Sequence, residues 1–134
     1  MSSSAAVPPP PPPSLRAFIA LAWLLGWGMV LDGLYQRLWG AFLPWWPAGW
    51  PWAAAAQSLG LQPVDTGWPI LCVGFGLLGA TFGLYNQRQW AYALAVVSAA
   101  LALAYAWPGT FLALLALGLL ALPATRRHIQ PPLA

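Results

Sequence analysis

Asp32 is the residue whose type and position could do the most unusual chemistry in this chain. It directly follows the apolar run at residues 17–31, so a membrane-spanning helix would place it in the outer third of the span. An ionised carboxylate at that depth is costly unless it is solvated or paired, and such residues can serve as proton or ion sites. Helical spacing places Gln36 and Tyr35 better than Arg37 to contact it. Because no second acidic residue lies at membrane depth, we favour hydration or a hydrogen bond to a neighbouring helix.

The other candidates for chemistry are one histidine, one cysteine and one serine: His128, Cys72 and Ser98. A single histidine excludes paired-histidine haem ligation within the chain, and His128 stands beside two arginines beyond the last apolar run, as a solvated residue would. A single cysteine excludes an intramolecular disulfide, and Cys72 stands in an apolar run where we expect it to be buried and inert. No histidine or carboxylate is placed to activate Ser98. We therefore expect neither an enzyme nor a metal centre.

Trp23 and Trp27 lie one helical turn apart in the middle of the first apolar run, away from either membrane interface. Such a pair could stack on a pigment or a quinone. Contact with lipid or with another protein helix explains the pattern at least as well, because aromatic pairs at helical spacing are common. The sequence leaves the cofactor unknown, with pigment, quinone or lipid contact as the alternatives.

The composition indicates that a bilayer surrounds most of the chain. Its 134 residues are 60% hydrophobic and 5% charged, whereas roughly a quarter of the residues in an ordinary soluble domain are charged. The apolar residues form long unbroken runs, as in transmembrane helices. The net charge is only +3 and no basic cluster exceeds Arg126-Arg127, so we expect membrane lipids and no nucleic acid as partners.

Breaks in the apolar runs predict an all-α integral membrane bundle of four transmembrane helices. A proline-rich arm at residues 1–14 precedes the transmembrane domain at 15–128, and a tail follows at 129–134. Asp65-Thr66 offers an N-cap for the second helix, and Pro123 should end or kink the fourth. The Trp/Pro-rich segment at 44–60 cannot form one regular helix and suits the outer interface. The helices are expected at about residues 17–38, 67–85, 90–107 and 109–122.

The arginines predict the orientation of this bundle. If the N-terminus is cytoplasmic, four of the five arginines lie inside and only Arg37 lies outside, in agreement with the positive-inside rule; the four are Arg16, Arg88, Arg126 and Arg127. The tryptophans and tyrosines fall at the two expected interfaces. We therefore predict a bacterial inner membrane or thylakoid protein with both termini in the cytoplasm.

Small residues recur at helical spacing on the second and third predicted helices. Helices in lipid associate through close van der Waals contact, which small side chains permit. We expect these residues to lie at helix contacts within this chain or with another chain: Gly76, Gly79, Gly83, Ala95 and Ala99.

Residues 83–91, Gly-Leu-Tyr-Asn-Gln-Arg-Gln-Trp-Ala, resemble a loose group of uncharacterised small four-helix bacterial membrane proteins. In that group a second helix ends in Gly-Leu, a short arginine-bearing turn follows, and Trp-Ala opens the third helix. The resemblance covers about the last half of the chain. It implies the same topology and no activity, and the tryptophan-rich segment and proline-rich arm depart from it.

The sequence therefore favours a non-catalytic accessory or scaffold subunit of a larger membrane assembly, such as a respiratory or photosynthetic complex. The scarcity of ionisable groups, the small-residue faces and the Trp/Pro segments motivate this interpretation. Two alternatives stay open, namely a small oligomeric transporter or channel that uses Asp32 and a membrane-complex assembly factor.

Overall fold

The computed structural model describes residues 10–41, 43, 56–105 and 107–129, and within these ranges all regular structure is helical. A single helical turn at 56–58 precedes α3. Most of the predicted proline-rich arm, residues 44–55 of the predicted interfacial segment and nearly all of the tail lie outside the described ranges. The elements are α1 (Pro13–Trp39), α3 (Pro63–Tyr85), α4 (Gln89–Ala102), the 3-10 helix η1 (Leu103–Tyr105), α5 (Trp107–Ala121) and α6 (Pro123–Ile129).

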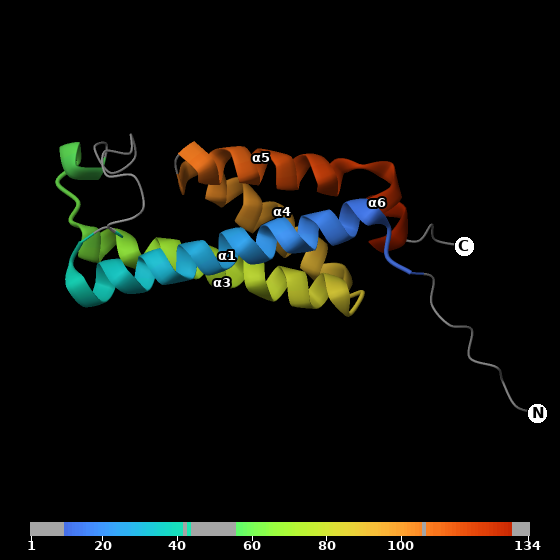
Figure 1. Ribbon diagram of the computed structural model, residues 1–134, viewed down its shortest axis with the longest axis horizontal. Helices are drawn as coiled ribbons and strands as arrows, with labels where there is room; N and C mark the ends of the chain where they lie inside the picture. Colours follow the sequence, from blue (N-terminus) through green and yellow to red (C-terminus); the bar gives the residue numbers. More distant parts are fainter. Residues whose placement is uncertain (1–9, 42, 44–55, 106, 130–134) are drawn as a thin grey trace, which may run out of the picture.

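The long helices α1 and α3 lie antiparallel and make the most extensive helix contact in the described structure (Figure 1). Two pairs of glycines, seven residues apart on each helix, bring the backbones together. A Cβ on Gly74 would lie 2.9 Å from the carbonyl oxygen of Gly26, and a Cβ on Gly67 would lie 2.9 Å from that of Gly33. Only glycine permits such an approach, so these four residues set the spacing of the pair.

The start of α3 differs from the sequence prediction. Gln62, not Asp65-Thr66, is the N-cap, and Pro63 occupies the first turn, where its missing N–H costs nothing. The Asp65 carboxylate instead accepts a hydrogen bond from the Gln62 backbone N–H at 3.2 Å, which completes a capping box. The helix consequently begins four residues before the expected position at residue 67.

The third predicted helix is shorter than expected, and the fourth begins two residues early and is followed by a bend. The helix expected to reach residue 107 ends at Ala102 and tightens into η1. The hydroxyl of Thr110 donates to the carbonyl oxygen of Leu103 at 2.8 Å, which satisfies one backbone acceptor at that turn. At Pro123 the chain bends by 66° between α5 and α6, which agrees with the predicted kink, although the sequence did not indicate a further helix.

Two helices, α1 and α3, are long and apolar enough to cross a membrane, and a third span exists if the bent pair α5 and α6 counts as one. The stretch Gln89–Tyr105, which comprises α4 and η1, is apolar but shorter. The all-α class is thus present, and within the described ranges two or three spans, not the four predicted, are long and apolar enough to cross a membrane.

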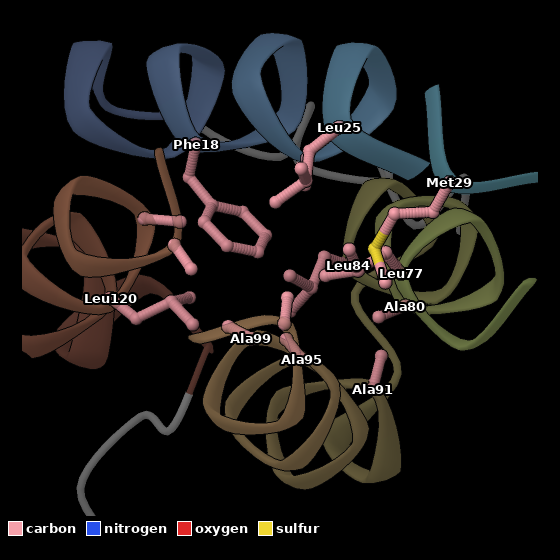
Figure 2. Close-up of a cluster of buried hydrophobic side chains, with 14 of the residues drawn as sticks. Phe18, Leu25, Met29, Leu77, Ala80, Leu84, Ala91, Ala95, Ala99 and Leu120 are labelled. Atoms are coloured by element: carbon pink, nitrogen blue, oxygen red, sulfur yellow. The ribbon is translucent and has the colours of Figure 1, made fainter. Parts of the chain in front are cut away.

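Side chains from α1, α3, α4 and α5 meet in one apolar core (Figure 2), which also includes Tyr105 of η1 and Ile129 of α6. Phe18 and Leu25 of α1 face Leu120 of α5, and α4 approaches them with alanines, which leave room for the larger side chains. At one end of the bundle, the hydroxyls of Ser14 and Thr125 lie 2.7 Å apart. The start of α1 and the α6 segment therefore lie at the same end (Figure 1).

Candidate functional site

Asp32 lies at the centre of a hydrogen-bonded network near the far end of α1. Only 2% of its surface is exposed. Its Oδ2 accepts hydrogen bonds from Gln36 Nε2 at 2.9 Å and from the Tyr105 hydroxyl at 2.6 Å. The backbone N–H of Leu43 donates to Oδ1 at 3.5 Å, near the outer limit for such a bond. Both carboxylate oxygens therefore have protein donors.

A second set of contacts extends this network to α3. The Thr66 hydroxyl donates to Gln36 Oε1 at 2.8 Å, while the amide nitrogen of the same glutamine is bound to Asp32. Thr66 and Gln36 are both buried. The network consequently joins α1, α3 and η1, three elements that are distant in the sequence.

Arg37 does not serve as the counter-ion of Asp32. Its Nη1 donates to the carbonyl oxygen of Val64 at 3.1 Å, and its guanidinium lies 5.1 Å from the centroid of the Trp68 ring. Such a cation–π contact suits a partly solvated arginine at an interface. Among the described residues Asp32 has no ion pair, so neutral donors alone stabilise the carboxyl group.

A cavity of about 370 Å³ adjoins the network between α3 and the α4–η1 stretch. Thr66 and Tyr105 belong both to its wall and to the network around Asp32, whereas Asp32 itself does not line it. Most of the wall is apolar, with residues such as Ile70 and Leu101. The volume lies within the usual range of small-molecule sites.

Trp23 and Trp27 lie elsewhere, on the outer face of α1. Their side chains are 56% and 42% exposed. The ring centroids are 5.8 Å apart with an interplanar angle of 67°, so the two rings meet edge to face. Trp23 and Trp27 therefore form one exposed aromatic surface, which does not contact the Asp32 network.

The glycines and alanines singled out in the sequence lie mainly between α3 and α4. A Cβ on Gly83 would lie 2.5 Å from that of Ala91, and one on Gly76 would lie 2.5 Å from Ser98 Oγ. A Cβ on Gly79 would have room, because the nearest atom, in the Leu94 side chain, would lie 3.9 Å from it. Ala95 and Ala99 are fully buried.

The expectation that Cys72 is buried was wrong, because its side chain is exposed on the outer surface of α3. An apolar neighbourhood in the sequence does not distinguish the core face of a membrane helix from its lipid face. His128 lies in α6 and is half-buried. No group of three His, Cys, Asp or Glu side chains that could hold a metal occurs within the described ranges.

Sequence reasoning missed Tyr105 and Thr66, the two side chains of the network that come from outside α1. Tyr105 lies 73 positions from Asp32 along the chain, so no local spacing connects them. The available signal was weak: a phenol in an apolar run needs a hydrogen-bond partner if it is buried.

Comparison with protein families, curated proteins and solved structures found no match for this chain.

Proposed function

We propose that this chain is a non-catalytic accessory or scaffold subunit of a larger membrane assembly, such as a respiratory or photosynthetic complex. The observation that carries the proposal is the outward position of Trp27 near the middle of α1. Tryptophan in membrane proteins is enriched at the two interfaces, where its ring nitrogen can reach polar groups. An exposed tryptophan at mid-span is better explained by a neighbouring protein helix than by lipid tails.

The Asp32 network supports a structural role over a catalytic one. The only acidic side chain inside the described core is occupied by donors from the chain itself. Because Asp32 is buried, an ion or substrate could reach this carboxylate only if the surrounding side chains moved. A fixed bundle with an aromatic outer surface suits docking.

We further infer that the bundle crosses the membrane four times, with both termini in the cytoplasm of a bacterial cell or on the equivalent side of a thylakoid. Together α4 and η1, of 14 and 3 residues, are about 27 Å long, close to the thickness of a thin hydrocarbon core. The contact between Ser14 and Thr125 supports an even number of crossings.

The test is gentle extraction from the native membrane, combined with a photo-crosslinking residue at position 27 and, as a control, at Phe75. Both positions are exposed, but Phe75 lies on α3. We expect a stoichiometric membrane-protein partner and a discrete crosslinked product from position 27 only. A homo-oligomer alone, or equal products from both positions, would contradict the proposal.

A second candidate is a small oligomeric transporter or channel, which the cavity beside Thr66 and Tyr105 favours. In this function the network would relay an ion or proton between the cavity and Asp32. Replacing Asp32 with Asn should then abolish flux in liposomes, and unchanged flux would remove Asp32 as the coupling site. An assembly factor, the third candidate, would co-purify with incomplete forms of the partner complex only.

A further inference from the structure

An open groove of about 830 Å³ lies on the outer surface of the bundle, between the first half of α1 and the last residue of α3. It is separate from the Asp32 network and from the cavity beside it. The groove runs along α1 for about two turns, from a charged residue to apolar ones. Its lining includes Arg16, Ile19, Ala20, Trp23, Leu24 and Tyr85.

Arg16 brings a positive charge to one end of this groove, and no acidic side chain neutralises it. Its side chain is exposed and has no ion pair among the described residues. The two aspartates of the chain are distant, because Asp32 is in the buried network and Asp65 is at the opposite end of α3. The exposed side chain of Tyr85 also lines the groove, and its hydroxyl is a second hydrogen-bond donor there.

We propose that this groove binds an anionic phospholipid. The guanidinium of Arg16 and the hydroxyl of Tyr85 would bind the phosphate, and one acyl chain would lie along Ile19, Ala20 and Trp23. Basic pockets between transmembrane helices on the cytoplasmic side are suited to such headgroups. The charged end of the groove and its apolar side chains together match an amphiphile. A soluble anion would gain nothing from the apolar side chains.

The lipid site does not rest on the proposed function, since a subunit and a transporter could both retain it; it shares Trp23 with the aromatic surface but does not include Trp27. The test uses native mass spectrometry of the purified full-length protein with phosphatidylglycerol or phosphatidylcholine of identical acyl chains. We expect preferential retention of phosphatidylglycerol. Arg16→Gln should weaken that binding by about fivefold, the factor expected for one basic residue at a membrane surface.

Two further variants separate the headgroup contact from the acyl contact. Arg127→Gln removes an exposed arginine from α6, outside the groove, and should leave retention unchanged. Ala20→Trp fills the groove at an exposed position and should lower retention while Arg16 is intact. Millimolar inorganic phosphate should not displace the lipid.

Equal retention of the two lipids would overturn the proposal, as would equal effects of Arg16→Gln and Arg127→Gln. Unchanged retention by Ala20→Trp would show that no acyl chain lies in the groove. Displacement by phosphate alone, or a protein found in the groove instead of lipid, would likewise contradict it. Circular dichroism of each variant separates these results from loss of folding.

Discussion

The two ends of the bundle use their charged and polar groups in opposite ways. At the end where α1 finishes and α3 begins, Asp32 is buried and hydrogen-bonded inside the protein. At the other end, Arg16, Arg88 and the arginines of α6 are exposed. The first end encloses one charged group in internal side-chain hydrogen bonds, although Arg37 and Asp65 there are exposed, whereas the arginines of the second end all face the surroundings.

This difference follows from the cost of burying charge. A carboxylate can be buried only where donors surround it, so Asp32 requires contributions from α1, η1 and the residue Leu43. Arginines at the ends of membrane helices reach the headgroup zone and need no internal partner. The acidic end should therefore be sensitive to single substitutions of its polar side chains, and the basic end tolerant of them.

The largest effect is expected from Asp32→Ala. This change leaves the buried donors of Gln36 and Tyr105 without their acceptor, and each unsatisfied buried donor costs about 1 to 3 kcal/mol. We expect a loss of about 3 kcal/mol in the free energy of unfolding, measured by denaturant titration in mild detergent. The control is Asp65→Ala, which removes only a capping contact and should cost about 1 kcal/mol. Equal losses in the free energy of unfolding would mean that the buried hydrogen bonds of Asp32 stabilise the fold no more than the exposed capping contact of Asp65.

Between the two ends, Gly74→Ala tests the backbone contact of α1 with α3. The new Cβ would meet the carbonyl oxygen of Gly26 and the Val30 side chain at 2.9 Å each, so we expect destabilisation by about 1 to 3 kcal/mol. Gly28→Ala is the matched control, since nothing lies within 4 Å of its Cβ position. That change should stabilise the helix by about 0.5 to 1 kcal/mol. Thermal unfolding of the two variants should thus shift in opposite directions, and a shift of both in one direction would refute the close contact.

Tyr105→Phe should have a smaller effect at the acidic end. It removes one donor from Asp32 and retains the ring, so we expect a loss of about 1 kcal/mol. Tyr85→Phe makes the same chemical change at the exposed, basic end and should leave the unfolding transition where it is. A similar shift of the unfolding transition in both variants would contradict the difference between the two ends.

The smallest effect is expected from the hydroxyl pair that ties α1 to α6. Ser14→Ala should cost about 0.6 kcal/mol, the typical value for a side-chain hydrogen bond within a membrane bundle. Thr125→Val should cost the same, and the double variant should cost no more than one of them, because they remove a single bond. Additive losses would indicate that the two hydroxyls do not bond to each other.

Local periodicity in the sequence predicted the features that depend on neighbours along the chain. Gln36 follows Asp32 by one turn and does bind it, and Pro123 does break the last apolar run. These features need only the geometry of a helix. The apolar runs likewise indicated an all-α membrane protein, although not how many of the helices are long enough to span.

Features that depend on tertiary contact were not predictable in this way. The pairing of Gly26 with Gly74 requires knowledge of how α1 crosses α3, and the bond from Tyr105 requires the position of η1. Cys72 was assigned to the wrong face because both faces of α3 are apolar. In a bilayer the hydrophobic pattern loses the contrast that identifies the core of a soluble protein.

The proposed topology places the two ends of the bundle on opposite sides of a membrane, with the basic end in the cytoplasm. In a Cys72→Ala background, single cysteines at Gln57 and at Ala124 report the two ends, since both positions are exposed. Labelling of intact spheroplasts with a membrane-impermeant maleimide should modify the variant Gln57→Cys at once, and Ala124→Cys only after lysis. Labelling of both variants in intact spheroplasts, or of Ala124→Cys alone, would contradict this account.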